Sequence, residues 1–327
     1  MRILKNPNIQ FVKYRYWAYA FSIVVLLIGL GGIIFNGLNW SIDFTSGIAA
    51  TLNLKAKDPN VAPLPIDELR SVLAKNGFPD AEIMYVGDEA NSVFQIKIKT
   101  TGKGSNISAE ARSKLIDIIQ SEFPEYVKGR DINKEVIEEI YEVGPKVGSE
   151  LRTQAFWAVL LALIAMIIYI WFRFELTFGL MGILALFHDV LIIVGIFALT
   201  GKEITMQIIA ALLTIVGYSI NDTIVIFDRI REDLKKNRKD PMPVIFNKSI
   251  NETLSRTIIT GGTTFITSAC LFFFGGSVIH DFAFAICLGI LFGTYSSICV
   301  ASNLVIDLHQ ITGKEKKTLQ HLTKKKK

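Results

Sequence analysis

Long runs of apolar residues alternate along this chain with one extended polar stretch. A helix needs about 20 predominantly apolar residues to cross the hydrocarbon core of a bilayer. Runs of this order occupy residues 17–36, 154–172, 178–199, 204–227, 257–274 and 283–305. The pattern predicts six transmembrane helices. The first is expected to be a retained anchor, because no small-residue cleavage pattern follows it.

The polar stretch after the first run changes its period and predicts an α+β domain. Val93–Lys99 alternates apolar and polar residues, as a half-buried strand does. The other predicted elements are strands Ile48–Leu54, Glu82–Val86 and Val136–Val143, and helices Pro65–Asn76 and Ser108–Phe123, the latter with Ser108 as N-cap. The order β-α-β-β-α-β is that of a ferredoxin-like domain. No paired carboxylates, nucleophile triad or phosphate loop stand out in this stretch, which favours a binding or mechanical role over catalysis.

Charge orients the predicted helices in the membrane. Basic residues precede the first run, follow the fourth and close the chain, so the positive-inside rule places both termini in the cytoplasm. The expected parts are an N-terminus 1–16, a helix 17–36, an extracytoplasmic domain 37–153, a five-helix bundle 154–305 with a cytoplasmic loop 228–256, and a basic tail 306–327. The chain is thus predicted to be an α-helical membrane protein with one outer α+β domain.

The composition agrees with this class of protein. Half of the 327 residues are hydrophobic and the mean hydropathy is +0.39, too apolar for a soluble globular chain of this length. The net charge of +5 resides largely in basic end and loop segments without interleaved aromatics, so no nucleic-acid partner is expected. The basic tail is expected to be disordered near anionic lipid, or to contact the ribosome. Cys270, Cys287 and Cys299 fall in the last two runs and are expected to be buried, with no disulfide or metal site.

An acidic residue, Asp222, lies inside the fourth apolar run, beside Ser219 and Asn221. A carboxylate at such a position costs roughly 2.5–3.5 kcal/mol on insertion scales, and by default marks a functional site. The functional interpretation is a proton carrier on a polar path, since burial and a nearby cation together tune proton affinity. The alternative is that Asp222 merely caps or hydrogen-bonds a neighbouring helix.

The cation expected to face Asp222 is Arg256, at the start of the fifth run. The fourth run leads inward and the fifth leads back out, so the two residues are predicted to share a depth and to form an ion pair. Considered alone, Arg256 would be an interfacial anchor whose side chain reaches toward water.

Two further groups of polar residues are candidates for a role. His188 and Asp189 lie near the middle of the third run and should face the bundle, in a packing network or in direct proton transfer. Asp43 and Gly47 follow the first run, either in an ordinary turn or in a gate between membrane and outer domain.

Small residues recur every four positions along the last run. They are Ala285, Gly289, Gly293, Ser297 and Ala301. Small residues at this spacing allow helix backbones to approach closely, so the ladder predicts a tight helix contact, either within the chain or with a partner subunit.

Six further stretches stand out together, residues 143–152, 172–175, 188–190, 217–231, 255–257 and 293–297. Together they closely resemble the SecF family of protein-export membrane proteins. The resemblance covers nearly the whole chain and is weakest in the outer domain and the tail. Ser41 and Ser46 stand where the family usually has glycines, whereas Asp43 and Gly47 remain.

The resemblance implies a function that the periodicity does not show. Members belong to the RND superfamily, and SecF forms one half of a pseudo-symmetric unit with SecD. The complex uses the proton motive force to promote late stages of preprotein export across the bacterial inner membrane, beside the SecYEG channel and with YajC and YidC as further expected partners. Asp222 and Arg256 match the family's proton-coupling residues. No cofactor and no enzymatic activity are implied.

Two other functions remain open from the residues. A half-size RND-type exporter of small molecules would share the fold and the buried acid, but would need an apolar substrate pocket in the outer domain. A scaffold that only stabilises SecD would tolerate replacement of Asp222 and Arg256, but not of the small-residue ladder.

Overall fold

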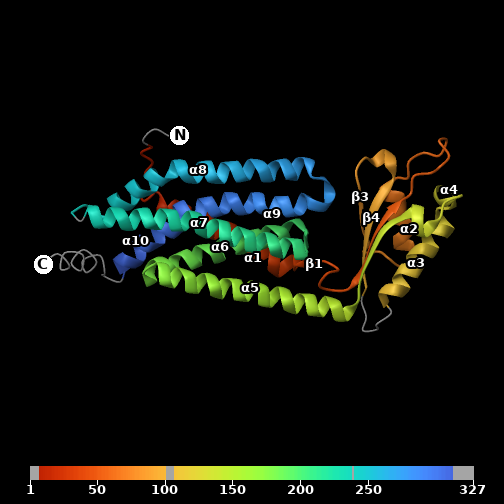
Figure 1. Cartoon of the computed structure of the whole chain (residues 1–327), viewed down its shortest axis with the longest axis horizontal. Helices are drawn as coiled ribbons and strands as arrows, with labels where there is room; N and C mark the ends of the chain where they lie inside the picture. The colour runs from red at the N-terminus through yellow and green to blue at the C-terminus, as the bar shows by residue number, and fades with distance from the viewer. Residues whose placement is uncertain (1–6, 101–106, 238, 312–327) are drawn as a thin grey trace.

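The computed structural model describes residues 7–100, 107–237 and 239–311, and places a helical bundle and an α/β domain at opposite ends of an elongated molecule (Figure 1). Among the described residues, six helices are long and apolar enough to cross a membrane, as predicted. They are α1 (Arg15–Asn36), α5 (Pro145–Arg173), α6 (Leu176–Thr200), α7 (Met206–Lys236), α8 (Met242–Phe274) and a sixth made of α9 (Gly276–Tyr295), the π-helical η3 (Ser296–Ala301) and α10 (Ser302–Ile311).

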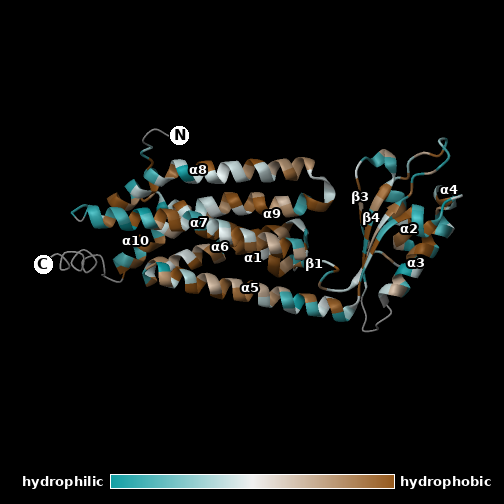
Figure 2. Ribbon diagram, viewed as in Figure 1, coloured by the Kyte–Doolittle hydropathy of each residue, from teal (hydrophilic) through white to brown (hydrophobic). Residues whose placement is uncertain are grey.

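Several helices extend beyond the apolar runs that predict them. The segment 228–256, expected as a loop, is largely helical, because α7 continues to Lys236 and α8 begins at Met242. Salt bridges spaced three and four residues apart, Arg229–Glu232 and Lys236–Glu232, support the last turns of α7 where the sequence is polar. Hydropathy marks the membrane-crossing part of a helix and misses its polar ends, which lie far from the α/β domain (Figure 2).

The start of α1 and the end of α10 lie at the end of the bundle opposite the α/β domain (Figure 1). Arg15 at the start of α1 pairs with Asp307 of α10 across 3.0 Å. Of the predicted tail 306–327, residues 306–311 continue α10, and the remainder lies outside the described residues.

Glycines set the closest helix contact in the bundle. A Cβ atom added to Gly195 of α6 would lie 2.6 Å from Cα of Gly29 in α1, so the two backbones touch and neither position has room for a side chain. In contrast, α8 packs against the bundle on one side only, and Cys270 on it is exposed. The expectation that all three cysteines are buried is wrong for Cys270 for this reason, and Cys287 and Cys299 are half-buried.

The α/β domain has the predicted ferredoxin-like order. Its elements are β2 (Gly47–Asn53), α2 (Ile66–Lys75), β3 (Glu82–Tyr85), β4 (Val93–Lys99), α3 (Ile107–Glu122) and β5 (Ile137–Val143), with short helical turns at Glu89–Asn91, Pro124–Val127 and Ile132–Val136. The sheet is antiparallel throughout, in the order β3-β4-β2-β5. The alternating residues Phe94, Ile96 and Ile98 point into its core, as their period predicts.

Ser108 does not cap α3, contrary to the sequence-based expectation. The helix already includes Ile107, and the Ser108 hydroxyl donates a hydrogen bond of 3.1 Å to the carbonyl oxygen of Val143, at the end of β5. Ser108 is buried and ties the helix to the sheet. The Ser108 hydroxyl bonds to a carbonyl oxygen 35 positions away and not to a backbone N–H of its own helix. Sequence spacing near Ser108 cannot predict such a distant contact.

Candidate functional site

Asp222 lies on α7 with its side chain buried in the bundle, only 3% exposed. One carboxylate oxygen, Oδ2, has no hydrogen-bond partner in the part of the chain that the structure describes. No lysine or arginine among the same residues lies within 4.0 Å of this carboxylate. A buried carboxylate without a direct partner is energetically costly, which distinguishes Asp222 from a helix cap.

Arg256 on α8 is the cation whose charge acts on Asp222, through a Coulomb attraction over more than ion-pair distance. Its side chain is exposed on the outer face of α8. The structure therefore holds the predicted pair in an open arrangement, in which the two side chains are neighbours and do not touch.

Exposed polar residues lie on the two helices that carry this pair. Asn221 of α7 is exposed, one residue before buried Asp222, and points away from the interior where Ser219 lies. On α8, Thr263 and Thr267 are exposed about two and three turns along from Arg256. The sequence suggested one polar path for Ser219, Asn221 and Asp222, and the structure separates Asn221 from the other two, because adjacent residues of a helix face different directions. We call the exposed surface of Asn221, Arg256, Thr263 and Thr267 the polar face.

A second buried carboxylate, Asp189 of α6, has a full set of partners. Its Oδ2 accepts hydrogen bonds from the hydroxyls of Ser219 (2.6 Å) and Ser296 (2.8 Å). Its Oδ1 lies 3.0 Å from Nδ1 of His188. These four residues, the Asp189 network, join α6, α7 and η3 in the middle of the bundle.

The π-helical turn η3 explains how the last helix reaches this network. One extra residue per turn shifts the direction of the side chains, and such turns are frequent at functional sites. Here Ser296 turns toward Asp189, while the hydroxyl of the next residue, Ser297, lies 2.8 Å from that of Thr223 on α7. Sequence reasoning missed Ser296 and Thr223 as site residues. The available signal was a pair of adjacent serines in an apolar run.

The small-residue ladder faces the interior of the same chain. All five residues, Ala285, Gly289, Gly293, Ser297 and Ala301, are buried. A Cβ on Gly289 would lie 2.4 Å from the Ile215 side chain of α7, and one on Gly293 would lie 3.1 Å from Cβ of Ser219. Of the two contacts left open by the sequence, the structure has the one within the chain, between α9 and α7.

A cluster of charges joins the α/β domain to the bundle. Glu203 lies in β6 (Glu203–Ile204), the short connection between α6 and α7, which pairs in parallel with β1 (Asn39–Trp40). Its carboxylate is buried and lies 2.5 Å from Nζ of Lys97 and 3.5 Å from Nζ of Lys99, both on β4. Nζ of Lys99 also donates a 2.5 Å hydrogen bond to the Asn39 side chain. We call Glu203, Lys97, Lys99 and Asn39 the Glu203 junction.

Asp43 and Gly47 occupy the turn that leads from α1 into the sheet. The Asp43 carboxylate accepts a hydrogen bond of 3.1 Å from the backbone N–H of Met206, the first residue of α7, so that it acts on the N-terminus of that helix. Gly47 has φ of +155°, and a Cβ there would lie 2.2 Å from the carbonyl oxygen of Ile98. Ser46 also has a positive φ of 141°, and its hydroxyl donates a hydrogen bond to the Thr100 carbonyl oxygen at 2.9 Å.

The comparisons with known proteins agree with this architecture. The family model of the protein export membrane protein SecD/SecF, C-terminal region, matches residues 124–311. The chain belongs to the SecD/SecF family. It is 43% identical to the protein translocase subunit SecF of Desulfurispirillum indicum, over 93% of this chain and 92% of that protein. It is 40% identical to SecF of Thermodesulfovibrio yellowstonii, over 94% and 96% of the two chains.

A solved structure of the family shows the same fold. The crystal structure of SecDF, a translocon-associated membrane protein from Thermus thermophilus, aligns with a TM-score of 0.76 at 41% identity. The alignment covers 93% of this chain and 39% of the SecDF chain, so this chain corresponds to about two-fifths of that fused protein. With six apolar helices and these relatives, the chain is a multi-pass membrane protein.

Proposed function

We propose that this chain is a SecF-type subunit of the protein translocase that converts the proton motive force into movement, with Asp222 as the proton-binding residue. The observation that carries the proposal is the buried Asp222 carboxylate, which has one unpartnered oxygen and a cation near it but not on it. Binding a proton removes the buried charge, and releasing it allows the carboxylate to attract Arg256. The two states differ in electrostatic energy, as a proton-driven switch requires.

The polar face supports SecD as the partner that covers this site. A guanidinium and an exposed asparagine are expensive to place against lipid tails, and such residues normally face protein or a water-filled cavity. Arg256, Asn221 and Thr263 lie exposed on the isolated chain. In the SecDF relative, SecD-type and SecF-type parts belong to one chain. We therefore assign the polar face to contact with SecD.

The Glu203 junction supplies a route from the proton site to the α/β domain. Asp222 lies on α7, and Glu203 lies in the short connection that leads into the N-terminal end of this helix. Asp43 accepts a hydrogen bond from the backbone N–H of Met206, the first residue of α7. A shift of α7 would therefore pull on β4 through Lys97 and Lys99. The Asp189 network, whose carboxylate already has three partners, is assigned to holding α6, α7 and η3 in register.

We further propose that the chain lies in the bacterial inner membrane, with both termini in the cytoplasm and the α/β domain outside. Unfolded preprotein leaving the SecYEG channel would be the substrate, with YajC and YidC as further candidate partners. A small-molecule exporter would need an apolar pocket in the α/β domain, and the cavity between α3 and the sheet, in the part of the domain that the structure describes, measures about 10 Å³, the room for one water.

The deciding experiment is preprotein release from membrane vesicles, with and without a proton gradient, at equal levels of the SecD–SecF complex. Asp222→Asn keeps the size of the side chain and removes its ability to bind and release a proton. We expect it to lose the gradient-dependent part of release and to retain the rest. Asp240→Asn, an exposed acid between α7 and α8, is the matched control and should behave as the wild type. Full gradient stimulation in Asp222→Asn would refute the coupling role and favour a scaffold.

A further inference from the structure

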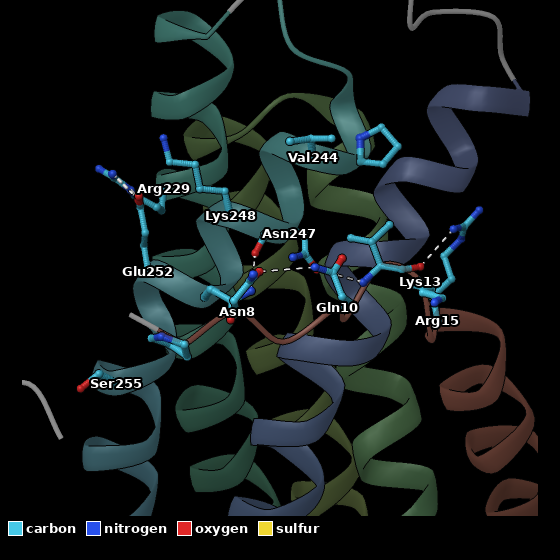
Figure 3. Close-up of a pocket in the computed structure, with 14 residues that line it drawn as sticks. Asn8, Gln10, Lys13, Arg15, Arg229, Val244, Asn247, Lys248, Glu252 and Ser255 are labelled. Carbon is cyan, nitrogen blue, oxygen red and sulfur yellow. Dashed lines mark hydrogen bonds and ion pairs between the residues drawn. The ribbon is translucent and has the colours of Figure 1, made fainter. Parts of the chain in front are cut away.

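A cavity of about 970 Å³ opens at the end of the bundle opposite the α/β domain (Figure 3). Residues 7–13, ahead of α1, form one wall, and the first turns of α8 together with Arg229 of α7 form the other. Small-molecule sites have volumes of about 300–1,000 Å³. The cavity is therefore large enough for a lipid headgroup.

Asparagine side chains of α8 hold the segment 7–13 in place through hydrogen bonds to its backbone. The Asn251 side chain accepts a hydrogen bond from the N–H of Ile9 (2.9 Å) and donates one to the carbonyl oxygen of the same residue (2.8 Å). One turn earlier on α8, Asn247 accepts from the N–H of Val12 at 3.3 Å. Two asparagines on one side of α8 thus fix the segment, so the cavity is a built feature of this end of the molecule.

The lining is strongly basic. Its charged side chains are Lys13, Arg15, Arg229, Lys248 and Glu252. Arg15 is neutralised by Asp307, and Arg229 by Glu252. Lys13 and Lys248 are exposed, and neither has a carboxylate within 4.0 Å among the residues that the structure describes. Lys248 lies beside Arg229 at one side of the cavity and Lys13 lies beside Arg15 at the other (Figure 3), so two cations without counter-ions flank the cavity, which favours an anionic occupant.

Uncharged polar groups also line the cavity. The amide groups of Asn8 and Gln10 line the same space. These groups can donate to, or accept from, the hydroxyls and ester oxygens of a headgroup.

Aromatic residues place the cavity at the surface of the membrane. Tyr14, Tyr16 and Trp17 flank the lining residue Arg15 and are exposed, Trp17 by 78%. Tyrosine and tryptophan are enriched where the hydrocarbon core meets the lipid headgroups. The mouth of the cavity is therefore at the depth of lipid phosphates.

We propose that this cavity binds the phosphate of an anionic phospholipid headgroup, with Lys13 and Lys248 as the cations at its two sides that attract the phosphate. Basic pockets between transmembrane helices are known to bind anionic headgroups, and the lysine ammonium acts on phosphate as a compact charge. A zwitterionic lipid carries no net charge to match the two lysines. The proposal concerns binding only and does not depend on the proposed proton coupling.

Native mass spectrometry of the full chain in detergent tests the proposal directly. Dioleoyl phosphatidylglycerol is titrated, with dioleoyl phosphatidylcholine as the zwitterionic counterpart. We expect one tightly held phosphatidylglycerol that phosphatidylcholine does not replace. A lysine near an anionic lipid contributes about a fivefold gain in binding, so Lys13→Ala with Lys248→Ala should weaken this binding roughly 30-fold.

Two matched variants make the result specific. Lys235→Ala with Lys239→Ala removes the same charge from the same end of the bundle outside the cavity lining, and should leave binding unchanged. Lys13→Arg with Lys248→Arg keeps the charge and should retain binding. Equal losses in the two alanine pairs, or wild-type binding in the cavity pair, would overturn the proposal. Displacement of the lipid by millimolar inorganic phosphate would also overturn it, since free phosphate would then be the ligand.

Discussion

The charge cluster between the α/β domain and the bundle makes a quantitative prediction for Glu203→Gln. The wild-type carboxylate is 7% exposed, and its partners Lys97 and Lys99 are 19% and 26% exposed. Removing one partner of a fully buried pair costs about 3–5 kcal/mol, and an exposed pair contributes about 0.2–1 kcal/mol. Because water reaches both lysines, we expect a loss of about 1–2 kcal/mol. The equilibrium between docked and undocked α/β domain should shift by about 5- to 30-fold.

Distances between spin labels measure this shift. One label is placed on α2 at Ala74, in the α/β domain, and the other at Val278, near the start of α9; both positions are exposed. The three native cysteines are first replaced by serine. In Glu203→Gln the distribution of distances between the two labels should broaden. Gradient-driven preprotein release should fall in parallel, because a movement of α7 would shift the α/β domain less once the contacts of Glu203 are weakened.

The control is an ion pair that lies wholly within the α/β domain. Glu142→Gln removes the partner of Arg112, at 3.1 Å, with the same change of charge and no contact to the bundle. It should leave both readings at the wild-type level. If Glu203→Gln also leaves the distances and the release unchanged, the Glu203 junction does not connect the two parts, and the route proposed through β4 is refuted.

Two further predictions concern stability. Gly289→Ala puts a Cβ 2.4 Å from the isoleucine that it faces on α7 and should lower the free energy of unfolding in detergent by about 1–3 kcal/mol. The control is Gly262→Ala, whose added Cβ would have nothing within 4 Å and should not destabilise the bundle. Equal stabilities of the two variants would contradict the packing argument. In the α/β domain, the hydrogen bond from Lys57 lowers the pKa of Glu135 below its ordinary 4.5. The stabilising effect is therefore present above pH 4.5 and is lost as the pH falls through the lowered value. Glu135→Gln should flatten this acid dependence in thermal melts, and an unchanged slope would count against it.

The elements of the fold could be predicted because their signals are local. Apolar runs of membrane-spanning length need no knowledge of the rest of the chain, and the strict alternation in Val93–Lys99 specifies a strand with one buried face. The prediction was less accurate where helices continue into water, as α7 does to Lys236. Hydropathy falls there, although capping and ion pairs still favour the helix.

The candidate site was only partly predictable. Asp222 and Asp189 are evident from sequence as acids in apolar runs, and the structure buries both. Their environments differ, because Asp189 receives hydroxyl donors from two other helices and Asp222 has an unpartnered oxygen. Glu203 gave no comparable signal, because an acidic residue in a short connection between helices is common. Only its contacts with Lys97 and Lys99 in the structure distinguish it.

The sequence by itself determined the number of membrane helices, the order of elements in the α/β domain, the family and the acid on which the proposed coupling depends. Only the tertiary structure decided which polar groups meet. Ser296 reaches Asp189 across 107 positions, and Lys97 reaches Glu203 across 106. Helix and strand formation depends on residues a few positions apart, whereas such contacts depend on side-chain directions at the ends of long, packed elements, including the π-helical turn η3. These are properties of the assembled bundle, which no local pattern encodes.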